Sequence, residues 1–164
     1  MDAELRRLSG VVGQALLERK VMLATAESCT GGWVASVITA TAGSSQWYER
    51  GFVTYSNAAK IDMLGVAEST LADAGAVSEA TAAEMAEGAL AHSRASVSVA
   101  ITGIAGPSGG SPGKPVGTVC FAWCRAEQAA VSETCHFHGD REQIRRQAVV
   151  QALQGLLARL PARD

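Results

Sequence analysis

Apolar residues recur along the chain with two different periods, and each period predicts one kind of element. Within residues 3–19 they return every three or four positions, at Leu5, Leu8, Val12 and Leu16, which predicts an amphipathic helix. Short runs rich in Val, Ile, Phe and Tyr predict strands instead. The same criteria predict helices over 31–41, 58–64, 68–74 and 79–92, a last helix from Asp140, and strands over 21–26, 51–55, 96–101, 117–124 and 131–137. This mixture of elements predicts an α/β fold.

The stretch 43–60 concentrates reactive side chains around a short strand that we expect to be buried. Asn57 is predicted to cap the helix that follows, and Gly65 suits the left-handed position after its end. Lys60 then falls in the first helical turn, where unpaired N–H groups and the positive end of the helix dipole disfavour a cation. This position and burial would both lower the pKa of Lys60, which would let the lysine act as a general base.

Two adjacent serines, Ser44 and Ser45, precede that lysine on a predicted loop. Lys60 follows Ser45 by fifteen positions, enough chain to leave along a loop and return along a strand. A serine hydroxyl needs a neighbouring base to become a good nucleophile, and Ser–Lys pairs are a known form of that arrangement. The stretch therefore has two interpretations, a Ser–Lys nucleophile pair or a capped loop with a solvated Lys60.

A second segment of small residues, Glu27–Gly32, joins the strand over 21–26 to the helix over 31–41. Backbone N–H groups at such a helix start can hold an anion. Neither G-x-x-x-x-G-K-[ST] nor G-x-G-x-x-G is present. Two interpretations of the segment are therefore open. One is substrate binding by Ser28, Thr30 and Gly31, and the other is a helix cap with close packing on the sheet.

Further candidates lie near the middle and the end of the chain. Thr102 and Gly103 open a long Gly- and Pro-rich segment after the strand over 96–101, and ligands in open α/β sheets bind beyond the carboxyl ends of strands. Arg141 and Arg145 lie four residues apart on one face of the last helix. Such a pair could clamp a phosphate or carboxylate, although a solvated pair is the alternative.

Composition narrows the class of protein. The chain has 164 residues, of which 18% are charged and 48% hydrophobic, with a formal net charge of -2. These values predict one folded domain over 1–164 and argue against disorder or a basic nucleic-acid surface. No apolar run approaches the ~20 residues that cross a bilayer, and MDAELRRLSG has the character of a helix start rather than a signal peptide. We therefore expect a cytoplasmic protein without a membrane or nucleic-acid partner.

The chain has four cysteines, none in a C-x-x-C pair: Cys29, Cys120, Cys124 and Cys135. Cys120 and Cys124 share one face of a predicted strand, and Cys135, His136 and His138 follow on the next, so a metal site is conceivable. Zinc ligands are usually spaced more tightly. Reduced thiols and no metal are therefore the expectation.

Several long motifs together resemble one family. They are TAESCTGGWVASVIT, AGSSQWYERGFVTYSNAAK, LGV, GAVSE, ITGIAGPSGG, KPVGTV and GDREQIRRQAV. In this order they resemble the successive motifs of the CinA C-terminal domain family, whose stand-alone members are nicotinamide-mononucleotide amidohydrolases of the PncC type. Other members are fused behind a larger domain implicated in pyrophosphate hydrolysis and competence. Because this chain starts at the first helix of the C-terminal module, we expect that module alone.

The resemblance implies a three-layer α/β/α domain with a mixed sheet. It implies hydrolysis of the carboxamide of nicotinamide mononucleotide to nicotinate mononucleotide and ammonia, a reaction of NAD salvage. It also implies no cofactor or metal and a homodimer or higher homo-oligomer.

Residue by residue, the resemblance implies that Ser45 is the nucleophile and that Tyr55 and Lys60 activate it and move protons. Ser45 would attack the amide carbon, an acyl-enzyme would form as ammonia leaves, and water activated by Lys60 would release the acid. Ser28, Thr102 and Gly103 would line the same pocket. Arg141 or Arg145 would match the family arginine, in the same subunit or a neighbouring one.

Two other hypotheses stay open at this point. The chain could be a non-catalytic module that binds a nucleotide or a partner protein, although Ser45, Tyr55 and Lys60 argue against a pure binder. It could also be an amidase for another pyridine nucleotide or small amide. Specificity depends on the shape of the pocket around the ring and ribose, which the sequence does not fix.

Overall fold

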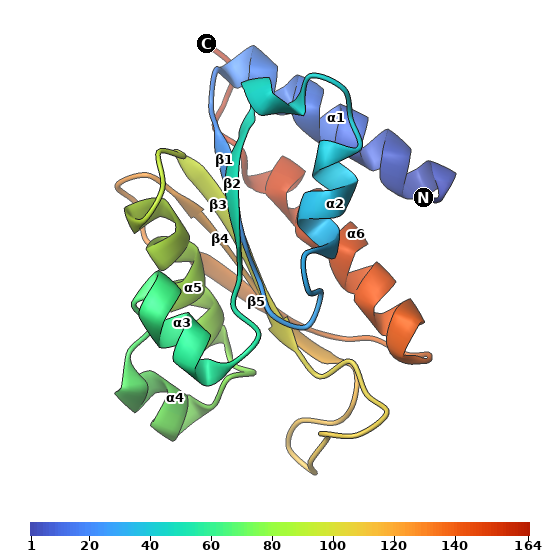
Figure 1. Ribbon diagram of the computed structural model, residues 1–164, viewed down its shortest axis with the longest axis vertical. Helices are drawn as coiled ribbons and strands as arrows, with labels where there is room; N and C mark the ends of the chain where they lie inside the picture. The colour runs from blue at the N-terminus through green and yellow to red at the C-terminus, as the bar shows by residue number, and fades with distance from the viewer.

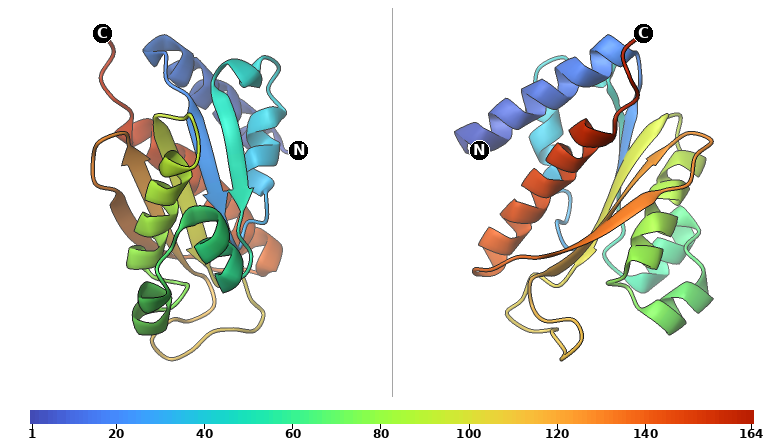
Figure 2. Two further views of the ribbon diagram at one scale, coloured as in Figure 1. Left: turned by 60° about the vertical axis from the view of Figure 1, so that its left-hand side comes forward. Right: turned by 180° about the vertical axis from the view of Figure 1, so that it is seen from behind.

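A five-stranded sheet with helices on both sides forms the computed structural model, which describes all 164 residues (Figure 1). One side of the sheet carries α1 (Ala3–Arg19), α2 (Trp33–Thr39) and α6 (Arg141–Arg159). The other side carries α3 (Asn57–Leu64), α4 (Glu68–Ala74) and α5 (Glu79–Ala91). Figure 2 shows the two helical layers on opposite sides of the sheet. The predicted three-layer α/β/α architecture is confirmed.

The sheet is mixed, and its strands lie in the order β2, β1, β3, β4, β5. Their bounds are β1 (Leu23–Glu27), β2 (Tyr48–Val53), β3 (Val97–Gly103), β4 (Thr118–Arg125) and β5 (Val131–His136). β1 pairs in parallel with β2 and β3, whereas the pairs β3–β4 and β4–β5 are antiparallel. The carboxyl ends of β1, β2 and β3 therefore meet at one end of the sheet, the place where open α/β sheets bind ligands.

The two faces of the sheet differ in the size of their side chains. Towards α5 the sheet presents small residues, namely Ala24, Ala26, Ala100 and Ala122. α3 lies so close to α5 that a Cβ on Gly88 would stand 2.0 Å from the Leu64 carbonyl oxygen, so only glycine fits there. The face towards α1, α2 and α6 carries larger residues, namely Leu23, Val99, Ile101, Phe121 and Trp123. Alternation along each strand produces this division.

Several local signals in the sequence are confirmed. The helices predicted over 3–19 and 68–74 have those bounds, and α5 begins after its cap Ser78. Asp140 and Gln143 form the predicted capping box at the start of α6. β4 and β5 form the predicted hairpin. None of the helices combines the length and apolar character needed to cross a bilayer.

Two predictions in the stretch 43–60 were wrong. The strand predicted as buried over 51–55 is the edge strand β2, which begins three residues earlier, and Tyr55 lies beyond it and is 65% exposed. Gly51 lies inside the strand and does not begin it. Only glycine fits at this position, because a Cβ there would stand 2.2 Å from the Tyr48 hydroxyl, which pairs with Thr25. The cap of α3 is Ser56, whose hydroxyl accepts the Ala59 N–H, and not Asn57.

Candidate active site

A polar cavity of about 220 Å³ lies beyond the carboxyl ends of the parallel strands. It is lined by Ser28, Cys29, Tyr55, Asn57, Lys60, Ala76, Val77, Thr102, Gly103, Ala105 and Arg141. The structure thus brings together six of the residues predicted from the sequence: Ser28, Tyr55, Lys60, Thr102, Gly103 and Arg141. Sequence reasoning missed the others. Only Asn57 carried a signal, as a predicted helix cap beside Lys60.

The centre of this cavity is a contact between Lys60 and Ser28. Lys60 is 1% exposed, and its Nζ lies 3.1 Å from Ser28 Oγ and 2.9 Å from the Thr54 carbonyl oxygen. Burial lowers the pKa of Lys60, because removing an ammonium from water disfavours its charged form. A lysine in its neutral form can accept the proton of the serine hydroxyl, so the pair has the parts of an activated nucleophile.

Strand alternation explains why Ser28 meets α3. Successive side chains leave a strand on opposite faces, so Glu27 points towards α2 and Ser28 towards Lys60 of α3. The Glu27 carboxylate accepts the N–H groups of Val34 at 2.9 Å and Ala35 at 3.1 Å. Two N–H groups at this helix start, for which anion binding and a helix cap were both open, are therefore paired with a carboxylate of the chain itself.

Thr30 and Gly31 are not among the residues that line the cavity, and their expected part in substrate binding stays a prediction. Thr30 is completely buried, and Gly31 is exposed with φ 58°. Their role in this structure is to form the turn between β1 and α2. Within that turn the backbone N–H groups of Cys29 and Thr30 have no acceptor in the chain, which leaves two donors beside Ser28.

The predicted contact between Ser45 and Lys60 is absent from this chain. Ser45 lies in the short helix η1 (Ser44–Gln46), exposed at the amino end of β2, whereas Lys60 lies beyond the carboxyl end of that strand. The six residues of β2 separate the two ends by about 20 Å. The connection does not leave and return as expected, because it enters β2 at its far end and traverses the whole strand.

Tyr55 and Arg141 form one wall of the cavity. Arg141 donates through Nη2 to the Tyr55 hydroxyl at 3.2 Å and through Nη1 to the Gly106 carbonyl oxygen at 2.7 Å. The Tyr55 hydroxyl is therefore paired with a guanidinium rather than with the Ser28–Lys60 pair. Arg141 comes from the same chain as the other lining residues.

Thr102 and Gly103 shape the floor at the end of β3. Thr102 is 1% exposed and its hydroxyl donates to the Ala76 carbonyl oxygen at 2.8 Å. A Cβ on Gly103 would stand 2.8 Å from the Val119 side chain. Both residues thus line the cavity through their backbone and packing.

The cysteines contribute no second reactive centre to the cavity. Cys29 lines it, but burial raises the pKa of its thiol to about 12, so the thiol stays protonated. All four cysteines are free. Cys120 pairs with Thr134 across the hairpin, which places Cys135 on the opposite face. No three His, Cys, Asp or Glu side chains are grouped so that they could hold a metal ion.

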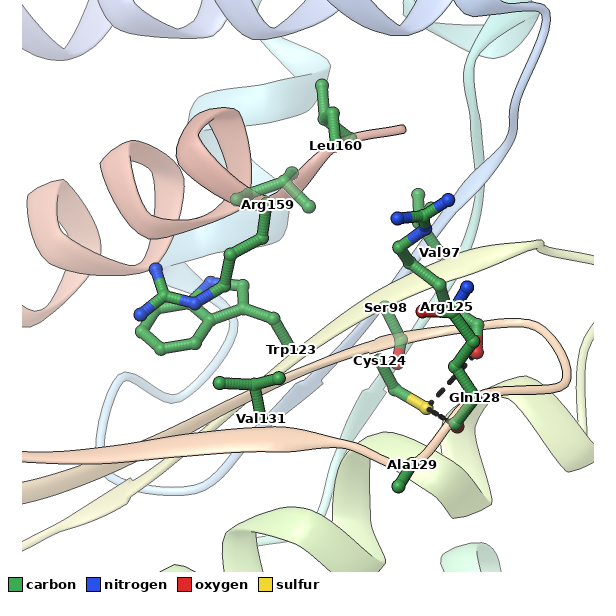
Figure 3. Close-up of a pocket in the computed structure, with 11 residues that line it drawn as sticks. Val97, Ser98, Trp123, Cys124, Arg125, Gln128, Ala129, Val131, Arg159 and Leu160 are labelled. Carbon is green, nitrogen blue, oxygen red and sulfur yellow. Dashed lines mark hydrogen bonds between the residues drawn. The ribbon is translucent and has the colours of Figure 1, made fainter. Parts of the chain in front are cut away.

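A second cavity of about 200 Å³ lies at the other end of the sheet, beside the hairpin between β4 and β5 (Figure 3). Arg159 lies 3.9 Å over the Trp123 ring and pairs with Glu133. The Cys124 thiol donates to the Gln128 carbonyl oxygen at 3.3 Å. None of the site residues predicted from the sequence lines this cavity, so the polar cavity is the candidate active site.

The fold and the site define a three-layer α/β/α domain with a small-molecule cavity at the carboxyl ends of its parallel strands. The family model for the CinA C-terminal domain matches residues 5–160. The chain belongs to this family.

Similar proteins carry two kinds of name. The chain is 59% identical to the nicotinamide-nucleotide amidohydrolase PncC of Escherichia coli K12, with 94% of each chain covered. It is 53% identical to a putative competence-damage inducible protein of Symbiobacterium thermophilum, covering 89% of this chain but 36% of that protein. The crystal structure of the competence/damage inducible protein CihA from Agrobacterium tumefaciens superposes with a TM-score of 0.93 at 45% identity, with 96% of each chain covered.

Proposed function

We propose that this protein hydrolyses the carboxamide of nicotinamide mononucleotide to nicotinate mononucleotide and ammonia. The observation that carries the proposal is the buried Lys60, whose Nζ lies 3.1 Å from Ser28 Oγ in the polar cavity. The name of the Escherichia coli relative supports the choice of substrate. The contact with Lys60 supports Ser28, in place of Ser45, as the nucleophile of this proposal.

In the first half of the reaction neutral Lys60 accepts the proton of Ser28 as Oγ attacks the carboxamide carbon. The free N–H group of Cys29, a residue that lines the cavity, would stabilise the oxyanion of the tetrahedral intermediate. One such donor typically contributes about 10²–10³-fold in rate. The carbon–nitrogen bond then breaks, and ammonia leaves with the proton that Lys60 returns.

In the second half water attacks the nicotinoyl ester on Ser28. Lys60 accepts the proton of water and gives it back to Ser28 Oγ when the ester bond breaks, which releases nicotinate mononucleotide. The positive pyridinium ring makes the carbonyl carbon more electrophilic in both halves. Its charge next to Lys60 would also favour the neutral amine.

Two side chains at the mouth of the cavity suit the rest of the substrate. Arg141 lines the cavity and can pair with the 5′-phosphate in a charge-assisted contact. The exposed Tyr55 ring beside it can lie against the pyridinium ring, since a cation is attracted to the face of an aromatic ring. In this assignment Tyr55 binds the substrate and takes no proton.

The proposal also includes the compartment and the oligomeric state in which the protein acts. A nucleotide substrate and four free cysteines fit a cytoplasmic protein of NAD salvage, because reducing compartments keep thiols free. Val53 and Met63, apolar side chains that are 46% and 40% exposed, fit a surface covered in a homodimer. Sedimentation of the purified protein tests the assembly.

The experiment that tests the reaction measures ammonia release from nicotinamide mononucleotide by the wild type and by two matched variants. We expect Ser28→Ala to lose at least about 10³-fold in kcat. We expect Ser45→Ala to stay within about twofold, because an exposed surface residue far from the site has little effect. No ammonia from folded wild-type protein would refute the proposed function, and equal losses in both variants would refute the choice of nucleophile.

The main alternative is a module that binds the nucleotide without hydrolysing it. The longer competence-damage relative is the observation that favours it, since the chain spans 36% of that protein. Wild-type protein that binds nicotinamide mononucleotide without releasing ammonia would support this alternative. Burying a lysine against a serine costs stability, and binding alone does not require such a pair.

A further inference from the structure

Arg145 contacts the turn that follows Ser28 and stays outside the cavity itself. Its Nε donates to the Cys29 carbonyl oxygen and its Nη2 to the Thr30 carbonyl oxygen, both at 3.0 Å. Its guanidinium carbon lies 5.3 Å from the centroid of the Trp33 ring. The two hydrogen bonds fall on the segment between β1 and α2, and the ring contact falls on the first residue of α2. One side chain of α6 therefore ties down the residues immediately after Ser28.

The two arginines of the predicted clamp have different positions. Arg141 lines the polar cavity, and Arg145 does not. Two N–H groups of Arg145 donate hydrogen bonds to carbonyl oxygens of the chain, in the bidentate manner for which a guanidinium is suited. The expectation that either arginine could bind the phosphate thus gives way to a division of roles.

Peptide geometry shows what Arg145 controls. The Cys29 carbonyl and the Thr30 N–H belong to one planar trans peptide, so they point in opposite directions. By fixing that carbonyl, Arg145 also fixes the direction of the Thr30 N–H, which has no acceptor in the chain. The next peptide is held as well, because the Thr30 carbonyl accepts from Arg145 and from the Trp33 N–H.

We propose that Arg145 is a positioning residue, which holds the turn after Ser28 so that the serine and the free Cys29 N–H keep the geometry required for attack on the carboxamide. This inference rests on the proposed function. Arg145 contacts no substrate atom, and it acts through the peptides on either side of Thr30. A displacement of about 1 Å in a reacting group can cost about 10²-fold in rate, so the loss should appear in kcat.

The kinetic test compares variants of three neighbouring arginines. We expect Arg145→Ala to lower kcat for nicotinamide mononucleotide about 10²-fold, with KM and the Kd of nicotinate mononucleotide changed less than about threefold. Arg145→Lys should recover part of kcat, since a lysine can reach one carbonyl but cannot bridge two. Arg141→Ala should instead weaken binding of nicotinate mononucleotide at least about tenfold, the loss of a phosphate contact. Arg146, which pairs with Asp2 and Glu4 on α1, supplies the control Arg146→Ala with unchanged kcat.

Amide hydrogen exchange supplies a readout that does not depend on turnover. In Arg145→Ala the amides of residues 29–33 should exchange faster than in wild type, while those of α1 stay unchanged. If wild-type protein releases no ammonia, the proposed function falls, and the exchange result still decides whether Arg145 holds the turn. A Kd for nicotinate mononucleotide weakened about tenfold or more by Arg145→Ala would make Arg145 a ligand and overturn the inference. Unchanged kcat together with unchanged exchange would overturn it as well.

Discussion

Two turns of this protein each combine serine with a glycine at positive φ but have opposite surroundings. The turn after β1 contains Ser28 and ends in Gly32 at φ 96°, and the turn before β2 contains Ser45 after Gly43 at φ 82°. Ser28 is 8% exposed and contacts Lys60, whereas Ser45 is exposed and has no hydrogen-bonded partner for its side chain. The first turn lies at the carboxyl ends of the parallel strands and the second at their amino ends.

The comparison teaches that the position of a serine in the sheet decides its chemistry. At the carboxyl ends of β1 and β2 the chain turns into α2 and α3, so Lys60 of α3 can reach Ser28, which directly follows β1. At the amino ends the connection only returns the chain to the sheet. Local composition is alike in both turns, and only the first receives a lysine from a neighbouring element.

The largest expected effect comes from removing the lysine that distinguishes the turns. Lys60→Met should lower kcat at least about 10³-fold, because the serine loses its base. In wild type kcat/KM should rise with pH through the lowered pKa of Lys60, since the neutral amine is the active form. Lys60→Met should lack that rise, and pH–rate profiles of both proteins measure it. Lys20→Met, exposed at the end of α1, is the matched control.

The same lysine should make the free energy of unfolding depend on pH. Its pKa in the folded protein lies below the value of about 10.4 for an exposed lysine, so between these two values the unfolded state binds more protons. The free energy of unfolding should therefore rise with pH through this window and fall as the pH drops. Lys60→Met should remove that part of the slope in urea titrations at several pH values. Equal slopes in wild type and variant would contradict a lowered pKa.

A smaller effect is expected from Glu27, which anchors the first turn and has no counterpart in the second. Glu27→Ala leaves the Val34 and Ala35 N–H groups without their acceptor, which should cost about 2–3 kcal/mol in the free energy of unfolding. Urea denaturation measures the loss. Glu142→Ala, on the exposed first turn of α6, should stay within about 0.5 kcal/mol. Similar losses in both variants would show that Glu27 does not stabilise the turn.

The smallest expected effect separates backbone strain from catalysis. Gly32→Ala and Gly43→Ala both place a side chain at positive φ, so each should cost about 1–2 kcal/mol of stability. Only Gly32→Ala should also lower kcat, because Gly32 closes the turn that carries Ser28. Thermal unfolding and ammonia release measured side by side test this pair. A kcat reduced equally in both variants would mean that the two turns are functionally coupled.

The prediction of the fold succeeded where local signals are strong. Leu5, Leu8, Val12 and Leu16 repeat with the helical period and mark the face that α1 buries. Ser78 and the pair Asp140 and Gln143 mark helix starts through side-chain hydrogen bonds that involve neighbouring residues only. The start of the edge strand β2 was misplaced because Gly51 was interpreted as the residue that begins the strand. Glycine is required there by a close contact with the Tyr48 side chain of the same strand, which no propensity reveals.

The prediction of the site was partial for a related reason. Burial of Lys60, Thr102 and Ser28 follows from packing across elements, and the sequence indicated only that their residue types could be reactive. Ser45 was chosen from a motif in a linear stretch, and the length of β2 then separated it from Lys60. Arg141 and Arg145 looked equivalent on a helical face, and only the neighbouring turn distinguished them.

The sequence by itself determined the class of fold, the family, most helix starts and the set of residue types that carry the chemistry. These depend on periodicity, capping and motifs, which act over a few neighbouring residues. The tertiary structure alone decided which serine meets the lysine, which anion occupies the start of α2 and which arginine faces the cavity. Those choices depend on the order and direction of strands in the sheet, because residues 32 or 116 positions apart become neighbours only when β1, α3 and α6 pack together.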